Sequence, residues 1–312
     1  MPRFISMLLS TVAVAAVLAP AAPAKTRVAI GLGDQSAAVF GAKNFRALKV
    51  RKVRYFIRWD AMRVGYARRA ADQYVRAARR AHVRVFMHIS TNDYRHRKAK
   101  LPSTRAYKRY VGRLVARYRK LGVREFGVWN EANHFSEPTY KNPRRAAQFF
   151  HIMRSACRGC TIVALDVLDQ RGTDSYIRRF YRALSASDRH AARLVGIHNY
   201  GDTNRHRTSG TRDIIRAVHR YNGGARFWFT ETGGIVNLGR SFRCSTSRAA
   251  RALTYMFHLA RVYRASVSRL YAYNYFAPKR ACQGFDSGLV THGGKARKGY
   301  RVFKAGAAHF TR

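Results

Sequence analysis

Two of the four glutamates in the sequence stand at the ends of apolar segments. Glu131 follows "FGVWN" (126–130), and Glu231 follows "RFWFT" (226–230). A carboxylate at the end of a buried segment costs free energy unless it has a partner or a chemical task. Two facing carboxylates can hydrolyse a glycosidic bond, one by donating a proton and the other by attacking the anomeric carbon, if their surroundings separate their pKa values. The alternative for either glutamate is a structural ion pair with one of the many arginines.

The two glutamates can meet only if the fold brings distant segments together. Apolar segments of strand length, rich in β-branched and aromatic residues, recur at 27–33, 53–59, 83–90, 125–130, 161–168, 194–200, 226–232 and 269–276. Their near-continuous apolar character is typical of strands in a covered parallel sheet. Amphipathic helical segments separate them, and Asn142 before Pro143, Thr211 and Ser245 are predicted N-caps. The alternation predicts a single closed (β/α)8 barrel of the α/β class.

An open, doubly wound sheet is the structural alternative. Such a sheet usually carries a glycine-rich phosphate-binding loop after its first strand. The segment "GLGDQS" (31–36) lacks the third glycine of that loop, so the sequence predicts no nucleotide cofactor. No histidine and acidic residues stand at metal-ligand spacing, and we therefore predict no metal site.

Residues with chemically useful side chains recur near the predicted strand ends, where barrel enzymes carry their active sites. They are Arg54, Trp59, His88, Asn130, His198, Tyr200, Tyr273 and Asn274. A single histidine or tyrosine at such a place is more often a hydrogen-bonded core residue than a ligand contact. The recurrence of these residues at one end of many strands instead predicts a shared site around the two glutamates.

Four motifs carry a resemblance to a known family. "VWNEAN" (128–133), "HNY" (198–200), "FTETGG" (229–234) and "DSGLVTHGGKARKGYRVF" (286–303) resemble the glycoside hydrolases of clan A, and most of all family 39 and its bacterial relatives. The resemblance extends over essentially the whole mature chain. It implies a retaining (β/α)8-barrel glycosidase that acts on a carbohydrate without a cofactor, with Glu131 as the acid/base and Glu231 as the nucleophile.

The resemblance also implies roles for neighbouring residues. Asn130 would bind the sugar 2-hydroxyl, where hydrogen bonds strengthen in the oxocarbenium-like transition state. Arg54 would lie beside Glu231, and Tyr200 would donate a hydrogen bond to the same carboxylate. A neighbouring cation and a hydrogen bond both favour the charged form of an acid. His198 would line the sugar site.

The eighth strand departs from this resemblance. Members of the clan often place a tryptophan there as a platform for a sugar ring, whereas this chain has "YAYNYF" (271–276). Tyr273 or Tyr275 could replace the platform, and Asn274 could reach a hydroxyl. The departure leaves the sugar, the linkage and the choice between exo and endo action open.

Five other residues have less definite roles. Trp59 and Trp129 are candidate stacking faces for sugar rings, although Trp129 equally suits the core. His88, at the end of the third predicted strand, is a further candidate substrate contact. Asp166 and Asp169, on the fifth strand and its loop, are interpreted as structural or rim residues.

The four cysteines indicate disulfide bonds, provided that the chain is exported. Four cysteines allow three connectivities, and composition alone does not choose among them. We predict Cys157–Cys160, which are close in sequence, and Cys244–Cys282, which would join the loops after the seventh and eighth strands, neighbours in a barrel. The single C-x2-C motif lacks the second ligand pair of a zinc site.

The first 24 residues predict a secretory signal peptide. Arg3 precedes an apolar segment (5–19), and Ala22-Pro23-Ala24 offers a cleavage site before Lys25. A retained membrane anchor is the alternative, and no later segment is long and apolar enough to span a bilayer. The catalytic domain is therefore predicted to occupy residues 25–312 of a secreted or envelope-associated protein.

The charge of the chain is extremely positive, with 61 lysines and arginines against 15 acidic residues and a formal net charge of +46. Such a surplus favours an anionic partner, for example a cell-wall or extracellular polymer. Because the arginines are spread along the whole chain, a specific nucleic-acid site is disfavoured. A compositional bias without a functional role is the alternative. The alternative function is a catalytically silent carbohydrate-binding barrel that adheres to anionic envelope polymers.

Overall fold

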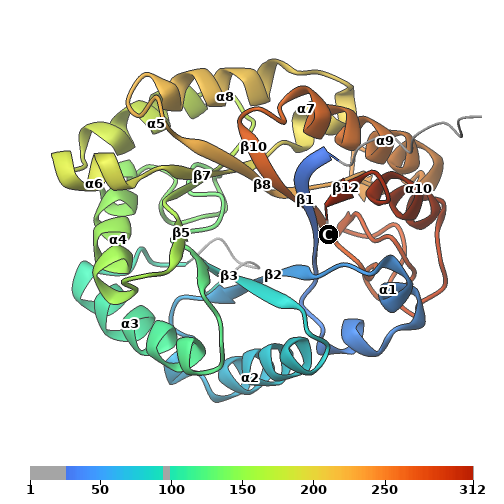
Figure 1. The fold of residues 1–312 in the computed structure, drawn as a ribbon, viewed down its shortest axis with the longest axis horizontal. Coiled ribbons are helices and arrows are strands. Elements are labelled where there is room, and N and C mark those ends of the chain that lie inside the picture. The colour runs from blue at the N-terminus through green and yellow to red at the C-terminus, as the bar shows by residue number, and fades with distance from the viewer. Residues whose placement is uncertain (1–25, 94–98, 312) are drawn as a thin grey trace, which may run out of the picture.

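A ring of parallel strands surrounded by helices is visible in the computed structural model, which describes residues 26–93 and 99–311 (Figure 1). The strands of the ring are β1 (Thr26–Gly33), β2 (Lys52–Arg58), β3 (Arg84–Ser90), β4 (Glu125–Gly127), β5 (Thr161–Val163), β6 (Leu165–Leu168), β7 (Leu194–His198), β8 (Arg226–Thr232) and β10 (Val267–Tyr273). They pair in the order β5-β4-β3-β2-β1-β10-β8-β7-β6. The predicted signal peptide lies outside the described residues.

The first and last strands in this pairing order, β5 and β6, belong to one continuous segment of the chain. β5 pairs with β4 and β6 pairs with β7, and only Ala164 separates them. At the break, the amide of Ala164 donates to the carbonyl of Leu194 at 2.8 Å. The segment predicted as the fifth strand therefore crosses from one neighbour to the other and closes the sheet. The predicted (β/α)8 barrel is confirmed, with its fifth strand in two pieces.

Helices form the outer ring. They are α1 (Lys43–Leu48), α2 (Gly65–Arg80), α3 (Thr104–Lys120), α4 (Pro143–Ala156), α5 (Thr173–Arg182), α6 (Ala186–Ala191), α7 (Tyr200–Arg205), α8 (Ser209–His219), α9 (Thr246–Val262) and α10 (Lys298–Ala307), with short 3-10 helices η1 (Ala37–Gly41) and η2 (Ala61–Arg63). α3 shows why they pack on the sheet: its buried residues recur at helical spacing, and its basic residues face outward. Among the described residues, we find no helix with the length and apolar character that crossing a bilayer requires.

The predicted helix caps are partly confirmed. Ser245 accepts a hydrogen bond from the amide of Arg248 at 3.2 Å and caps α9. Asn142 precedes Pro143 at the start of α4, but its side chain makes no capping bond. Thr211 lies inside α8 and not at its start, because the helix begins two residues earlier, at Ser209. The prediction of Thr211 as an N-cap was wrong.

The barrel interior is filled in layers. Phe86, Val163, Trp228 and Tyr271 form a buried cluster within it. Further along the strands, toward their carboxyl ends, follows a layer that we call the polar layer: Arg54, His88, Asp166 and His198, each with no exposed surface. Such layers are typical of closed barrels. The aromatic cluster thus forms the floor on which the polar layer rests.

Both predicted disulfide bonds are present. Cys157–Cys160 joins the end of α4 to the start of β5, at the amino end of the strands. Cys244–Cys282 joins the loops that follow β8 and β10. The same two loops pair as a small antiparallel sheet of β9 (Asn237–Leu238) and β11 (Phe285–Asp286), while β12 (Phe310–Thr311) extends the main sheet beside β1.

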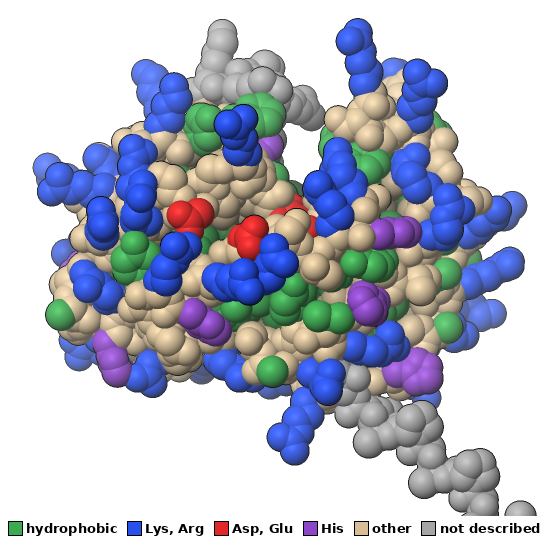
Figure 2. Space-filling view, turned by 90° about the horizontal axis from the view of Figure 1, so that it is seen from above, with side chains coloured by type: hydrophobic (Ala, Val, Ile, Leu, Met, Phe, Trp, Pro, Cys, Tyr) green, Lys and Arg blue, Asp and Glu red, His purple; other side chains and the backbone are tan. Residues whose placement is uncertain are grey.

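Lysine and arginine side chains are widely spread on the face of the molecule in Figure 2. Acidic side chains are few on the same face. This distribution agrees with the spread of arginines along the sequence. It does not show the single basic patch that a nucleic-acid site would need.

Candidate active site

Glu231 stands near the end of β8, where two donors hold its carboxylate. Arg54 Nη1 lies 2.6 Å from Oε2, and the Tyr200 hydroxyl donates to Oε1 at 3.0 Å. Arg54 is completely buried, and the Glu231 side chain is 11% exposed. Both contacts favour an ionised carboxylate. The arrangement that the resemblance implied for these three residues is the one in the structure.

Glu131 lies just after β4, with its backbone in the left-handed region at φ 42°. Its amide donates to Asp166 Oδ1 at 3.0 Å, which holds this unfavourable conformation. Its carboxylate oxygens lie 3.0 Å from His198 Nδ1 and 3.8 Å from His134 Nδ1. Burial opposes the charge on Glu131, but the hydrogen bond and charge of His198 outweigh burial and lower its pKa.

One imidazole nitrogen links the two carboxylates. His198 Nδ1 is 3.0 Å from Glu131 Oε1 and 3.9 Å from Glu231 Oε2. Since both distances start from the same nitrogen, the two carboxylates lie on either side of one imidazole ring edge. The fold therefore brings the ends of the fourth and seventh predicted strands together.

His198 lies between two carboxylates, which favour its positively charged form. Its other nitrogen, Nε2, lies 3.1 Å from Asp166 Oδ1, so both ring nitrogens face carboxylate oxygens, although the orientation at Nε2 is not that of a hydrogen bond. Burial opposes this charge, but the charges of Asp166 and Glu231 outweigh burial and raise the pKa of His198 to about 10.

Asp166 is the buried counter-ion of His198. Burial opposes its charge, but the charge of His198 more than compensates and holds the pKa of Asp166 well below the ordinary value. Its oxygens accept hydrogen bonds from the Glu131 amide and from the Thr230 hydroxyl. Asp166 therefore contacts the residues that carry or adjoin both glutamates. Its interpretation as a structural or rim residue missed this central position.

His88 is neutral and lies beneath the site. Arg54 Nε and Nη2 both lie 3.2 Å from His88 Nδ1. Arginine can only donate, so Nδ1 accepts, and the ring carries its single proton on Nε2, which faces Asp166 at 4.0 Å. Burial lowers the pKa of His88 to about 3, in agreement with a neutral ring. His88 thus supports Arg54, and its prediction as a substrate contact was wrong because it has no exposed surface.

The ligand atoms of His88, Asp166 and His198 lie within 4.8 Å of one another, the spacing of a possible metal site. His88 Nε2 and His198 Nε2 both face Asp166, and neither forms a well-oriented hydrogen bond among the described residues. The contact of Arg54 with Nδ1 of His88 places the proton of that ring on Nε2, and a protonated nitrogen has no lone pair for a metal. The absence of a metal stays a prediction from the sequence.

Two glycines make room for the polar layer. A side chain at Gly127 would place Cβ 2.1 Å from the ring of His88, and one at Gly196 would place it 2.0 Å from Asp166 Oδ2. Real Cβ atoms do not approach so closely. Gly127 and Gly196 therefore allow the polar side chains to fill the space between neighbouring strands.

The remaining predicted residues divide between the site and the core. Asn130 borders the site, since Arg54 Nη2 donates to its Oδ1. Trp129 belongs to the core: it is 1% exposed and its Nε1 donates to Glu137 at 2.8 Å. Trp59 is 8% exposed and packs against Tyr110. Neither tryptophan offers an open face to a sugar ring, so the structure does not support their prediction as stacking faces.

The structure changes the predicted roles of some residues at and after the end of the last barrel strand. Tyr275 is completely buried. Both polar atoms of the Asn274 amide bond within its own loop, to Phe276 and Ser287, which counts against its prediction as a hydroxyl contact. Tyr273 is half-buried, and its ring stacks at 6.2 Å on Phe285, which is 38% exposed. Phe285 was not predicted, because an isolated aromatic residue in a loop carries no periodic signal.

A cavity at the opposite end of the barrel is not lined by the residues of this candidate site. A cavity of about 620 Å³ lies near the amino end of β2, between η1, α1 and α2, where Phe40, Arg46 and Arg80 line it. Conserved chemistry in barrels is found at the opposite, carboxyl end of the strands. We therefore base the site on the facing carboxylates and their partners.

Comparison with known proteins reveals similarity of structure without similarity of sequence. No protein-family model matches the sequence, and no curated protein matches it. Many solved structures are similar to this chain, and three that match about nine-tenths of it illustrate the likeness. A family 39 glycoside hydrolase from Bacteroides cellulosilyticus WH2 has a TM-score of 0.60 at 11% identity, covering 91% of this chain and 64% of that protein. The chain thus spans less than two thirds of that relative.

The other two solved structures differ in the share of their own length that aligns with this chain. A xylanase from Paenibacillus barcinonensis has a TM-score of 0.62 at 13% identity. The aligned region covers 91% of this chain and 99% of the xylanase. A glucosidase from Croceicoccus marinus has a TM-score of 0.67 at 12% identity and covers 92% of this chain and 67% of that protein. At these identities the likeness establishes the fold, and that fold is the (β/α)8 barrel.

Proposed function

We propose that this protein is a glycoside hydrolase that acts by a retaining double displacement. The observation that carries the proposal is the pair of facing carboxylates with different partners, Glu231 between a cation and a hydroxyl, and Glu131 on an imidazolium. The solved structures with the same fold include a xylanase and a glucosidase, which supports a carbohydrate substrate.

In the first step, Glu231 attacks the anomeric carbon and the leaving oxygen takes a proton from Glu131. Arg54 and Tyr200 keep Glu231 ionised for the attack. Glu131 must carry that proton to the leaving oxygen, and His198, whose Nδ1 lies 3.0 Å from Oε1, is the neighbouring group that supplies it. The step leaves a glycosyl ester on Glu231, an ionised Glu131 and a neutral His198.

In the second step, Glu131 removes a proton from water, and the resulting hydroxide displaces Glu231 from the anomeric carbon. The proton returns through Glu131 to His198, so both carboxylates are ionised again and the charges balance. Two inversions at one carbon give net retention. The shared nitrogen of His198 supports the short separation of roughly 5–5.5 Å that retaining enzymes have, and that separation remains a prediction.

The test is a panel of aryl glycosides and wall polysaccharides with Glu231→Gln, Glu131→Gln and, as a matched control, Glu125→Gln. Glu125 pairs with Arg269 at the amino end of β4, so its variant should keep kcat. Glu231→Gln should abolish turnover of every substrate. Glu131→Gln should retain most activity only on glycosides with good leaving groups, because these need no proton.

Product stereochemistry followed by NMR decides the mechanism. Initial release of the retained anomer is expected, and azide should restore turnover to Glu231→Ala by replacing the missing nucleophile. An inverted initial product, or near-wild-type activity of Glu231→Gln, would contradict the assignment of Glu231. If the wild-type protein bound oligosaccharides but cleaved none, the silent carbohydrate-binding alternative would replace the enzyme.

We also propose that the protein is exported and associates with anionic envelope polymers. Residues 1–24 have the pattern of a signal peptide, and a net charge of +46 attracts carboxylates and phosphates. N-terminal sequencing of the secreted protein tests the first point, with Lys25 as the expected first residue. An uncleaved chain would contradict it.

A further inference from the structure

Exposed large hydrophobic residues gather in the loops at the carboxyl end of the barrel strands. Among the described residues they include Phe135 and Tyr140 after β4, Leu238 after β8 and Phe285 after β10. Exposed apolar surface beside a polar site marks a place where a ligand binds. The ring of Phe285 contacts Tyr200, which donates a hydrogen bond to Glu231.

Phe285 belongs to an aromatic group that includes Tyr200, the hydroxyl donor to Glu231. Its ring lies 5.6 Å from Tyr200, edge to face, and Tyr200 donates to Glu231. On its other side it stacks on Tyr273 at 6.2 Å, and Tyr273 lies 6.1 Å from Phe56. Three of these rings come from different strand ends, whereas Phe285 reaches the group from a loop. With 38% of its surface exposed, Phe285 still presents apolar area to a ligand.

The backbone of Phe285 is fixed on both sides. Gly284 accepts a hydrogen bond from the Asn237 side chain at 2.7 Å, and the Asp286 carboxylate accepts one from Arg297 at 2.8 Å. The backbone carbonyl of Asp286 accepts a hydrogen bond from the amide of Val236 at 2.6 Å, beside the pairing of β9 with β11. An aromatic ring on so well anchored a segment is positioned before any ligand arrives.

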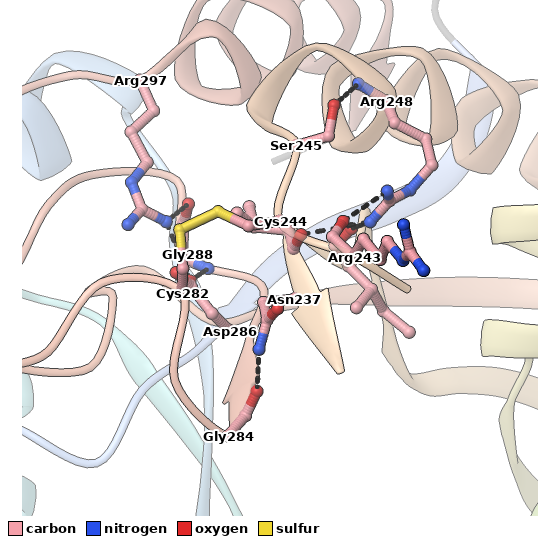
Figure 3. The surroundings of a disulfide bond; sticks show 12 residues. Asn237, Arg243, Cys244, Ser245, Arg248, Cys282, Gly284, Asp286, Gly288 and Arg297 are labelled. Atoms are coloured by element: carbon pink, nitrogen blue, oxygen red, sulfur yellow. Dashed lines mark hydrogen bonds and ion pairs between the residues drawn. A yellow bond between two sulfur atoms is a disulfide. The ribbon is translucent and has the colours of Figure 1, made fainter. Parts of the chain in front are cut away.

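The Cys244–Cys282 bond ties this segment to its neighbour. Figure 3 shows the bond between the two loops, next to the Asn237–Gly284 contact. Cys282 lies three residues before Phe285, and Cys244 lies at the base of the loop that contains β9. The covalent bond and the two-stranded sheet therefore hold the same two loops together.

We infer that Phe285 is the aromatic platform of the sugar subsite beside Glu231, and that the Cys244–Cys282 bond positions it there. The inference rests on the proposed function for the identity of the ligand as a sugar. An aromatic face suits the apolar C–H face of a pyranose ring, and its negative quadrupole favours the cationic character that develops at the anomeric carbon. The platform thus comes from a disulfide-held loop and not from the eighth strand itself.

The first experiment measures affinity separately from turnover. In the Glu231→Gln background, calorimetry with xylo-, manno- and cello-oligosaccharides compares Phe285 with Ala, Leu and Trp at this position. Phe285→Ala and Phe285→Leu should each lower affinity about tenfold, whereas Phe285→Trp should preserve it. Leucine is the matched control, because it keeps apolar volume without an aromatic face.

The outcomes separate this inference from the proposed function. If Phe285→Ala binds as tightly as Phe285 while Glu231→Gln abolishes turnover, the platform is wrong and the hydrolase stands. If the wild-type protein binds sugars without cleaving them, and Phe285→Ala weakens that binding, the hydrolase is wrong and the platform stands. If no sugar binds, both are wrong.

The second experiment tests the disulfide through a double-mutant cycle. Cys244→Ser with Cys282→Ser should lower affinity several-fold, and should add little once Phe285 is already alanine. Cys157→Ser with Cys160→Ser is the control, since that bond lies at the amino end of the strands, and it should leave affinity unchanged. Additive losses from Phe285→Ala and from the Cys244–Cys282 pair would overturn the positioning role of this bond.

Discussion

Asp166→Asn should destabilise the fold in a pH-dependent way, because Asp166 is the buried partner of a buried cation. His198 has a pKa of about 10, so removing its proton in the folded protein at pH 7 costs about 4 kcal/mol. Asp166 supplies the largest of the contributions that raise this pKa. Removing its charge should therefore lower the free energy of unfolding by about 3 kcal/mol at neutral pH, as is usual when a buried ion pair loses one partner.

The pH range follows from the two pKa shifts. The pKa of Asp166 is lowered by folding, so its contribution is present above its unfolded value near 3.9 and is lost below it. The pKa of His198 is raised, so its contribution is full below about 6.5 and disappears as the pH rises through about 10. The difference between wild type and Asp166→Asn should be largest from about pH 4 to 6.5 and should shrink toward pH 10.

Urea unfolding followed by tryptophan fluorescence at pH 5.5, 7.5 and 9.5, without reductant, measures this difference. Asp188→Asn is a suitable control, because Asp188 pairs with the more exposed side chains of His151 and Arg154. Asp188→Asn should lower the free energy of unfolding by less than about 1 kcal/mol. Equal costs for the two variants, or a difference for Asp166→Asn that stays constant from pH 5.5 to 9.5, would refute the imidazolium assignment.

Three further predictions follow from the site and the surface. Arg54→Lys should reduce kcat at least about a hundredfold in steady-state assays, because lysine cannot contact Glu231, Asn130 and His88 at once. Glu137→Gln should be more stable than wild type in urea at pH 9 but not at pH 5. Burial raises the pKa of Glu137 to about 8, so this group destabilises the folded protein increasingly as the pH rises from about 4.5 to 8. Binding to acidic wall material should fall steeply from low to physiological salt in sedimentation assays, while cleavage of a small neutral glycoside changes little.

Each of these has its own check. Arg58→Lys, on the same strand but paired with Asp60, should keep kcat, and an Arg54→Lys enzyme with full kcat would contradict the role of Arg54. A stability gain for Glu137→Gln that is the same at both pH values would show that Glu137 is not protonated by burial. Binding to wall material that does not change with salt concentration would show that the net charge of +46 reflects amino-acid composition and has no role in binding.

The sequence predicted the architecture because its signals were repeated. Eight apolar segments identify the barrel even though one of them is broken at Ala164, where no residue type marks the break. Glu131 and Glu231 were found because an acid at the end of an apolar segment is unusual. The fold brings them together with Arg54 and Tyr200, while their catalytic roles remain predictions.

What the sequence did not predict depends on contacts between distant segments. Asp166 carries the same signal as Glu131, an acid in an apolar strand, but its importance comes from facing His198 and Thr230 across the barrel interior. Trp59 looked suitable for stacking, yet its direction is set by packing against Tyr110. Phe285 contacts Tyr200 and Tyr273 from a loop that pairs with the loop after β8.

The joining of the loops after β8 and β10 has a consequence for how such a barrel can be recombined. Loops of a barrel usually belong to separate strand–helix units, and can then be exchanged one at a time. Here the exchange of either loop alone would leave a lone thiol and one strand of a two-stranded sheet without its partner. The two loops are therefore inherited, grafted or redesigned successfully only as one unit, and variation in either should be accompanied by variation in the other.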